Sequence, residues 1–319
     1  MNKSTRNLLI IFVILAAVVF IFFKGKDKIN TQKVEEKLFV ADSSKIEKIE
    51  IVKTGESITL EKVNGAWQVS KPIVYPADTN SIAPILGNLQ NFRIESITST
   101  NPEKFNNYLD TVNNTQITVY QGGKNLGTFI LGKYALSYMN SYVKKPDDNK
   151  ILLASNLNQS LFVKPLKDFR NKVIWQLQTI ALNKIEFRST DSLKVNFDAV
   201  KDSTGRWFIG ADSIPNANIT GFLNTMAAFM TEDFVDSTVT TFPEPTYTVK
   251  IFGGPQQYSI NLYKMSNTSP AQYLVQVSDN KQLFKFSDAV ARGVMKQRTD
   301  FIPAPPKEEK KDTKTEKKK

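Results

Sequence analysis

The sequence contains no cysteine and no histidine among its 319 residues. Without cysteine the chain cannot form disulfides, thiolate metal sites or a thiol nucleophile. Without histidine it lacks the base of Ser-His-Asp and Cys-His triads and the usual ligand of zinc and copper. Only carboxylates, Lys, Tyr, Ser and Thr remain for catalysis. These absences close most of the common enzyme mechanisms, and we expect a protein with no enzymatic activity, no cofactor and no metal.

The excess of basic over acidic charge lies mostly at the two ends of the chain. The net charge is +11, of which residues 1–28 contribute +4 and residues 303–319 contribute +3. A nucleic-acid-binding domain would concentrate its basic residues on one folded face. This distribution argues against a nucleic-acid partner.

Long apolar runs are also scarce, and residues 8–23 form the single stretch of sixteen consecutive apolar residues. As a helix it would be about 24 Å long, slightly less than the roughly 30 Å hydrocarbon core. Flanking Lys and Arg side chains can close that gap by snorkelling. A cleaved signal peptide needs a small-residue site after the run, whereas this run ends in Phe22-Phe23-Lys24. The pattern predicts an uncleaved membrane anchor over residues 1–28.

Lysines lie on both sides of the apolar run, so the positive-inside rule does not fix its orientation. Anchors at the N-terminus usually export the chain that follows. We therefore expect a single-pass protein of a bacterial inner membrane with its body in the periplasm.

The body carries one series of motifs twice, in the same order. Gly65-Ala66-Trp67 returns as Gly205-Arg206-Trp207, and the apolar stripe of Leu86 returns as that of Leu223. The other matches are residues 46–51 with 182–187, Gly122-Gly123 with Gly253-Gly254, and Tyr142 with Tyr273. Their offsets lie between 131 and 140 residues. A near-constant offset through a hairpin, a helix and further strands predicts two tandem copies of one module.

This pattern divides the chain into five parts. We expect an anchor over residues 1–28, a stalk over 29–41, a first repeat over 42–171, a second repeat over 172–302 and a disordered Lys/Glu/Pro tail over 303–319.

Local signals in the first repeat predict strands, then a helix, then strands. Residues 49–51 and 58–63 alternate, and Asn64-Gly65 is a strong hairpin signal that leads into the strand of Trp67. Asp78 can cap a helix whose apolar stripe runs over residues 82–89.

Four further features complete the predicted repeat. Pro84 falls in the first turn of the helix, and Asn101-Pro102 opens a short second helix through Tyr108. Strands are expected over residues 117–120, 126–131, 141–144 and 151–153, and short helical segments over 155–162 and 165–171.

The second repeat is predicted to have the same order. Strands are expected over residues 185–188, 193–198, 207–209, 246–252, 258–263, 272–277 and 282–286, with helices over 218–230 and 288–298. Because strands and helices are grouped instead of alternating one for one, the fold class is α+β, with two tandem sheet-plus-helix modules behind one transmembrane helix.

The repeat markers are interpreted as structural. Trp67 and Trp207 could be stacking platforms for a sugar or peptide, but their recurrence favours core aromatics packed against the helices of Leu86 and Leu223. Gly65 and Gly205 mark the turns before these tryptophans.

Three other patterns have weak chemical readings. Asp147-Asp148-Asn149 offers oxygen ligands for calcium but lacks the EF-hand spacing and distal Glu, so a solvated hairpin loop is expected. The two Gly pairs lack a phosphate-binding pattern and are expected to be hairpin turns. Paired carboxylates of a hydrolase stay open, because their separation is spatial.

These features together resemble the domain of unknown function 4340, an uncharacterised bacterial family. The resemblance is carried by the anchor, by Ile46, Ile49 and Ile51, by Leu60-Glu61-Lys62 with Gly65-x-Trp67, and by Pro76-Ala77-Asp78. It covers about residues 40–300. In the second copy these motifs become Asn196-Phe197-Asp198 and Pro215-Asn216-Ala217, so that copy is assigned by position.

The resemblance implies an envelope protein, often encoded beside an ABC transporter of the gliding-motility type, and it supplies no catalytic residues. The expected function is that of a non-enzymatic, membrane-anchored accessory or scaffold that contacts a membrane protein, such as ABC-type transporter subunits. The alternatives are an envelope module that binds a glycan or peptide and, third, a carboxylate-dependent hydrolase.

Overall fold

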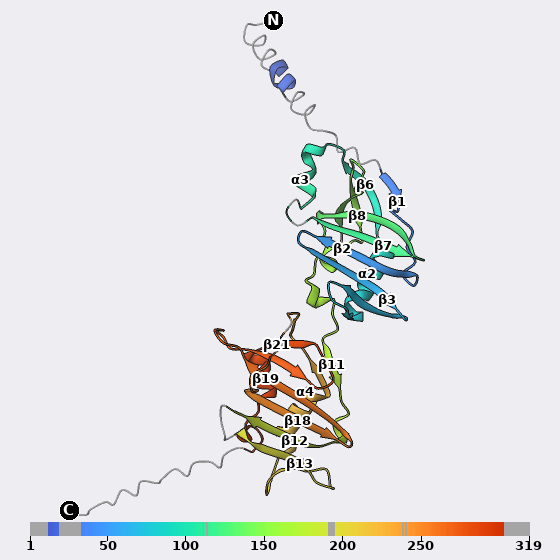
Figure 1. The fold of residues 1–319 in the computed structure, drawn as a ribbon. Coiled ribbons are helices and arrows are strands. Elements are labelled where there is room, and N and C mark those ends of the chain that lie inside the picture. Colours follow the sequence, from blue (N-terminus) through green and yellow to red (C-terminus); the bar gives the residue numbers. More distant parts are fainter. Residues whose placement is uncertain are drawn as a thin grey trace, which may run out of the picture. The chain divides into compact units, whose positions relative to one another are not determined.

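The computed structural model describes residues 12–18, 33–110, 112, 114–190, 195–237, 239 and 241–302. The chain divides into two compact units, residues 1–171 (unit 1) and residues 172–319 (unit 2). In the described residues both units consist mostly of antiparallel sheet with a few helices, so the fold class is α+β (Figure 1).

Unit 1 contains a ten-stranded sheet in its described part, in the order β1-β6-β10-β9-β8-β7-β2-β3-β4-β5. The strands are β1 (Lys33–Glu36), β2 (Ile46–Lys53), β3 (Glu56–Val63), β4 (Ala66–Lys71), β5 (Tyr75–Pro76), β6 (Arg93–Ser99), β7 (Thr115–Gln121), β8 (Lys124–Tyr134), β9 (Ser141–Lys144) and β10 (Ile151–Ser155). The helices are α2 (Thr79–Asn91) and α3 (Phe105–Tyr108), and 3-10 turns occupy Pro102–Lys104, Gln159–Leu161 and Leu166–Asp168.

Unit 2 contains, in its described part, a nine-stranded sheet in the order β15-β14-β13-β12-β18-β19-β20-β21-β17, and a separate pair β11-β16. The strands are β11 (Val173–Gln176), β12 (Leu182–Ser189), β13 (Phe197–Lys201), β14 (Trp207–Ile209), β15 (Asp212–Ser213), β16 (Ala228–Met230), β17 (Asp233–Val235), β18 (Tyr247–Gly253), β19 (Gln256–Lys264), β20 (Gln272–Val277) and β21 (Leu283–Ser287). The helices are α4 (Asn216–Ala227), α5 (Asp288–Val294) and α6 (Arg298–Phe301), with a 3-10 turn at Thr179–Ala181.

The predicted meander and its turn are confirmed in unit 1. Asn64 and Gly65 have φ angles of 50° and 84° and join β3 to β4 in a two-residue turn, because only such residues tolerate positive φ at both positions. The helix prediction is confirmed as well: Asp78 caps α2 and accepts a hydrogen bond of 3.0 Å from the Asn80 amide. Pro84, however, is the sixth residue of α2 and not part of its first turn.

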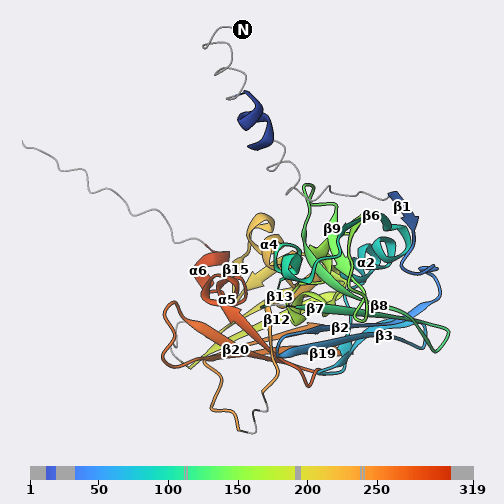
Figure 2. The same ribbon diagram turned by 90° about the horizontal axis from the view of Figure 1, so that it is seen from above.

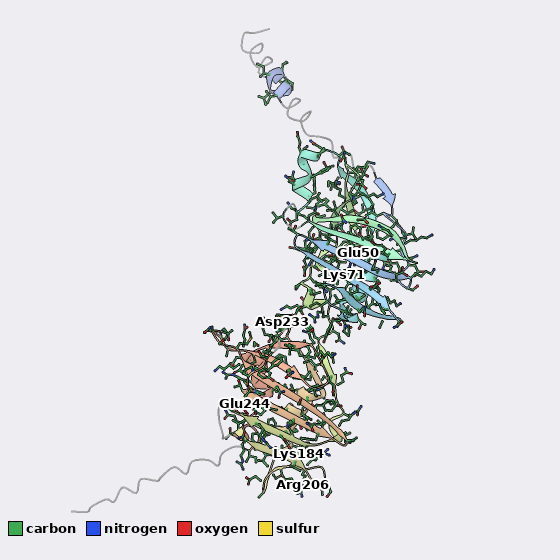
Figure 3. The ribbon with its side chains drawn as sticks, viewed as in Figure 1. Glu50, Lys71, Lys184, Arg206, Asp233 and Glu244 are labelled. Atoms are coloured by element: carbon green, nitrogen blue, oxygen red, sulfur yellow. The ribbon has the colours of Figure 1, made fainter. Side chains whose placement is uncertain are left out.

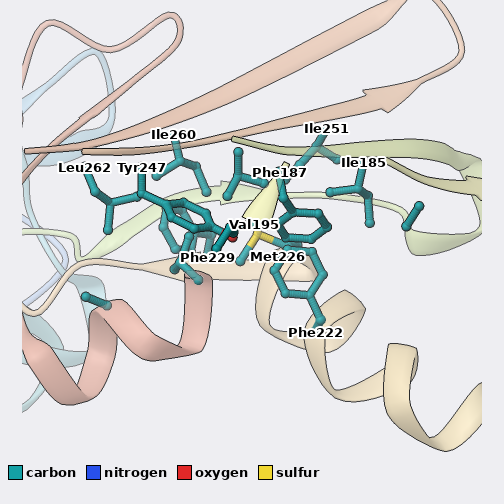
Figure 4. Packing of buried hydrophobic residues seen from close by; sticks show 14 of the residues in the cluster. Ile185, Phe187, Val195, Phe222, Met226, Phe229, Tyr247, Ile251, Ile260 and Leu262 are labelled. Carbon is teal, nitrogen blue, oxygen red and sulfur yellow. The ribbon is translucent and has the colours of Figure 1, made fainter. Parts of the chain in front are cut away.

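Each sheet buries one face under its helices. In unit 1, Ile82, Ile85 and Leu89 of α2 join a core with strand residues such as Ile49 and Leu60, and Figure 2 shows α2 on one side of β2, β3, β7 and β8. In unit 2, Figure 4 shows the corresponding layer, in which Phe222 and Met226 of α4 face Phe187, Ile251 and Ile260 of the sheet. The strands therefore alternate between a core face and an outer face.

Residues 33–41, placed in a stalk by the sequence, lie in unit 1. β1 pairs with β6, Ala41 is buried, and the ring centroid of Phe39 is 5.5 Å from that of Phe92. The apolar residues Leu38, Phe39 and Ala41 explain this, since they can be buried although the stretch around them is charged.

Other elements also differ from the prediction. The strand β6, which begins two residues after α2, was not predicted. The single helix expected over residues 288–298 is instead two helices, α5 and α6, because the chain leaves helical geometry at Met295. The tail over residues 303–319, which was predicted to be disordered, falls outside the described residues, as does most of the predicted anchor. Of the apolar run only residues 12–18 are described, and they are helical; none of the described helices has the length and hydrophobicity needed to cross a bilayer.

Candidate functional site

The outer face of unit 1 carries a charged cluster on its central strands. The Lys48 ammonium lies 3.0 Å from a Glu50 carboxylate oxygen, and the Tyr120 hydroxyl donates a 2.9 Å hydrogen bond to the same carboxylate. The Lys48 nitrogen also lies 3.7 Å from the centre of the Tyr120 ring. These residues meet because Lys48 pairs with Tyr120 in the β2–β7 register. We call Lys48, Glu50 and Tyr120 the unit 1 face cluster.

The contacts of this cluster shift three protonation equilibria. Burial alone would raise the pKa of the Glu50 carboxyl, but the bonds from Lys48 and Tyr120 outweigh it and leave that pKa below its usual range. The hydrogen bond with Glu50 raises the pKa of both Lys48 and Tyr120. At neutral pH the cluster therefore holds one carboxylate, one ammonium and one neutral phenol.

Unit 2 carries a cluster at the matching place. The Lys184 ammonium lies 2.7 Å from Glu186 and 3.1 Å from Asp198, and Arg188 lies 2.7 Å from Asp198. Burial alone would raise the pKa of Asp198, but Arg188 and Lys184 lower it below its ordinary value. The Lys184 nitrogen lies 5.6 Å from the centre of the Phe252 ring. We call Lys184, Glu186, Arg188 and Asp198 the unit 2 face cluster.

The two clusters occupy the same register. Lys48 pairs with Tyr120, and Lys184 pairs with Phe252, in the strand pairs β2–β7 and β12–β18. Each pairing follows a one-residue register shift, with the extra residue at Glu47 in β2 and at Asn183 in β12. Such bulges re-aim the side chains that follow them. Both units thus present a Lys-x-Glu pair beside an aromatic ring on an outer sheet face.

The charge continues beyond these pairs along each outer face. In Figure 3, Lys71 lies near Glu50 in unit 1, and its charge helps to lower the pKa of Glu50. Arg206, labelled with Lys184 in unit 2, lies 5.5 Å from the centre of the Phe208 ring. Mixed charges and half-buried aromatic rings suit recognition of another polar surface, since they combine charge complementarity with contact area.

A groove in unit 1 is the second candidate. One part has a volume of about 490 Å³ and the adjoining part about 230 Å³, and both are lined by Leu38, Lys145 and Asp148. Ile94, Ile97 and Leu152 line the smaller part. The predicted solvated loop Asp147-Asp148-Asn149 thus borders a groove, with Asp147 and Asn149 exposed. No cluster of three or more acidic metal ligands occurs within the described ranges.

The repeat markers lie at matching positions, but their burial differs. Trp207 is 3% exposed in the unit 2 core, whereas Trp67 is only half-buried at the edge of the unit 1 core, so the prediction of two buried tryptophans is wrong for Trp67. The residue paired with each tryptophan at the end of the neighbouring strand also differs. The Trp67 carbonyl accepts from the amide of Ala77, and the Trp207 carbonyl accepts from the amide of the larger Ile214.

The remaining markers behave as expected. Gly65 and Gly205 have φ angles of 84° and 90° in the turns before the tryptophans. Leu86 and Leu223 are partly buried and pack against the two cores. None of these residues lies in a face cluster or in the groove.

Two of the matched motifs are shifted by one residue. Val143 of β9 pairs with Leu131, and Val275 of β20 pairs with Leu262, which aligns Tyr142 with Leu274 and not with Tyr273. A one-residue shift reverses the face: Tyr142 packs edge to face against Tyr108 with ring centroids 4.8 Å apart, and Tyr273 is buried in the unit 2 core. The Gly pairs are hairpin turns, at Gly122-Gly123 and at Gly254-Pro255.

The sequence contains a signal for the face clusters in a repeated Lys-Ile-Glu motif. Lys48-Ile49-Glu50 and Lys184-Ile185-Glu186 recur at an offset of 136 residues. Alternation alone places Lys and Glu on the face opposite a buried Ile. Their aromatic neighbours, Tyr120 and Phe252, could not be paired with them without the sheet register.

The fold and these outer faces define a class: a chain with two antiparallel α+β units whose exposed sheet faces carry paired charges. The family described as Domain of unknown function (DUF4340) matches residues 67–250, more than half of the chain. The chain belongs to this family. No curated protein and no solved structure matches it.

Proposed function

We propose that this chain is a non-enzymatic, membrane-anchored accessory or scaffold protein of the bacterial envelope, with its body in the periplasm and its two face clusters as contact surfaces. The apolar run of residues 8–23 and the bulky Phe22-Phe23 at its end support the anchor. The partner is a membrane protein, and ABC-type transporter subunits are the partner that the family resemblance implies.

We also propose that the two units are copies of one module. Read from β5 to β6 and from β15 to β17, the two sheets follow the same strand order. The register shifts at Glu47 and Asn183 and the paired residues Lys48 and Lys184 all follow an offset of 136 residues. Bulges are kept within families, so a shared bulge supports common descent of the units.

The matched face clusters are the observation that carries the scaffold proposal. Two similar surfaces on one chain suit a partner that presents a repeated or symmetric surface, because symmetric oligomers offer each contact more than once. Two linked contacts also bind more tightly than either alone. The carboxylates of Glu50 and Asp198 stay ionised in ion pairs, so they are poor proton donors at neutral pH.

Site-specific cross-linking tests this proposal. A photoreactive amino acid is placed at Tyr120 or Phe252 of the full chain in its native membrane, with Val163 and Ile180, which are exposed elsewhere, as control positions. The scaffold proposal expects the same membrane protein to be captured from both face positions and not from the controls. Capture from neither face, or equal capture from the controls, contradicts it.

N-terminal sequencing of the membrane-extracted protein tests the anchor separately. The expected result is an intact N-terminus that includes the apolar run. A mature chain that starts after Lys24 contradicts the anchor without bearing on the face clusters.

The groove of unit 1 favours a second candidate function, binding of a glycan or peptide in the envelope. Its larger part, about 490 Å³, has the size of a small-ligand site and combines apolar Leu38 and Phe39 with the charged Lys145 and Asp148. Native mass spectrometry of the detergent-extracted protein tests this candidate. A retained ligand that is lost in Leu38→Asp supports it, and a ligand-free spectrum contradicts it.

A further inference from the structure

An ordered loop of unit 1 exposes large apolar side chains. In the connection between β8 and β9, Leu136 is 108% exposed, Tyr138 80% and Met139 53%. Val112, which is 73% exposed, precedes β7 at the same end of the sheet, because Thr115 of β7 pairs with Leu131 of β8. We call Val112, Leu136, Tyr138 and Met139 the apolar tip.

The loop is held in shape by its own bonds. The Ala135 amide donates to the Asn140 carbonyl at 3.0 Å, and the Asn140 amide donates to the Ser137 carbonyl at 2.9 Å. The rings of Tyr134 and Tyr138 pack edge to face with centroids 5.2 Å apart. These contacts fix the backbone while the three apolar side chains point away from the unit's core.

The fold does not require this apolar surface. The connection between β19 and β20 of unit 2 lies between the corresponding strands and consists mostly of polar residues, Ser266-Asn267-Thr268-Ser269. Single exposed apolar residues are ordinary, but several grouped at one end of a sheet mark a contact surface.

Two observations indicate which surface the tip contacts: the charge around it and the length of residues 24–32, the tether between the apolar run and β1. No acidic residue occurs between Asp110 and Asp147, and Lys133 is the penultimate residue of β8, close to the start of the loop. Tyr beside Leu and Met, flanked by Lys, is typical of segments that enter the membrane interface. Residues 24–32 separate the apolar run from β1 and span at most about 30 Å. The tip follows β8, which is four strands away from β1 in the sheet. The distance from β1 to the tip across the sheet is therefore about 20 Å.

We propose that the apolar tip inserts into the interface of an anionic bilayer and gives unit 1 a second membrane contact. This inference rests on the proposed function, because the anchor brings unit 1 to the membrane. The tip and the tether then hold unit 1 at two points, which restricts its orientation and leaves its outer face accessible to a partner.

The absence of cysteine allows a direct test with the full chain. Leu136→Cys carries an environment-sensitive fluorophore, and Ser266→Cys, in the corresponding loop of unit 2, is the matched control. Both variants are reconstituted into phosphatidylethanolamine/phosphatidylglycerol vesicles. The expected result is a blue-shifted emission at position 136 that nitroxide-labelled lipids quench several-fold more than emission at position 266, with a smaller difference in phosphatidylcholine vesicles.

The outcomes separate the two proposals. If the chain floats with the vesicles but both positions are quenched equally, the tip proposal is wrong and the anchor stands. If the chain fails to float, the anchor itself is wrong. If emission at position 136 shifts only after solubilised host membrane proteins are added, without lipid quenching, the tip contacts a protein and the membrane proposal is overturned.

Discussion

In each unit a lead-in segment precedes the first long central strand, β2 in unit 1 and β12 in unit 2. An aromatic ring of this segment packs beside a phenylalanine that follows the longest described helix of the unit, α2 or α4. Phe39 lies 5.5 Å from Phe92 in unit 1, and Trp175 lies 4.9 Å from Phe229 in unit 2. The strand residue next to each ring differs. Unit 1 has Gly127, where an added Cβ would lie 2.4 Å from the Phe39 ring, and unit 2 has Tyr258, which packs 5.5 Å from Trp175.

This contrast shows how one arrangement accepts different side chains. Where the lead-in ring lies over the strand, the strand residue must be glycine; where the ring lies beside it, a tyrosine fits. Positions 127 and 258 correspond, since Gly127 pairs with Val119 and Tyr258 with Ile251.

The largest expected difference between the units concerns the tryptophans. Trp207→Ala should destabilise unit 2 by about 3–5 kcal/mol, because it leaves a cavity in a closed core. Trp67→Ala should cost unit 1 only about 1–2 kcal/mol, since that ring is partly exposed at the edge of the unit 1 core. Urea unfolding followed by circular dichroism measures both. Equal losses of unfolding free energy in the two variants would contradict the difference in burial between Trp67 and Trp207.

A glycine substitution at another pair of corresponding positions tests how closely the strand of unit 1 is packed. Gly132 corresponds to Tyr263, and an added Cβ at Gly132 would lie 2.6 Å from the Tyr108 carbonyl oxygen and 2.8 Å from that of Tyr142. Gly132→Ala should therefore destabilise unit 1 by about 1–3 kcal/mol. The matched control is Gly221→Ala in α4, where nothing lies within 4 Å and a gain of about 0.5–1 kcal/mol is expected. Thermal melts distinguish these opposite signs.

The face clusters are expected to contribute least to stability. A carboxylate whose pKa is lowered on folding adds stability that is present above its unfolded pKa, about 4, and is lost as pH falls through the folded value. Both Glu50 and Asp198 have lowered pKa values. Glu50→Gln and Asp198→Asn should each flatten the acid side of the stability profile, by about 1 kcal/mol or less at low salt.

Unfolding measured from pH 3 to pH 7 at low and high salt tests this small effect. The difference between each variant and the unaltered chain should shrink as salt rises, because these pairs are partly exposed to solvent. A large, salt-independent loss at neutral pH would show that the clusters are structural supports and not surfaces available to a partner.

Turns and helix starts were predicted correctly where a few neighbouring residues determine them. Asn64-Gly65 predicted its hairpin because the turn needs positive φ, and Asp78 predicted the start of α2 because a cap needs a side-chain acceptor. The strand β6 was missed because it follows α2 so closely that no turn signal separates them. Phe39 was missed because its partners, Phe92 and Phe129, are distant in sequence.

The candidate site was predictable only in part. The Lys-x-Glu pairs at residues 48–50 and 184–186 are visible in the sequence, and alternation places them on an outer face. The contribution of Tyr120 and Asp198 depends on the pairing of separate strands. The one-residue shift between Tyr142 and Tyr273 depends on bulges and turn lengths that an offset alone does not resolve.

The claim that one module occurs twice is best tested by superposing unit 1 on unit 2 in a crystal structure of the chain. We expect Phe39 to fall on Trp175, the bulge at Glu47 on that at Asn183, and Lys48 on Lys184. If the bulges lie at different places, or if Lys48 and Lys184 face opposite sides of their sheets, the two units are not copies of one module and the matched contact surfaces do not exist.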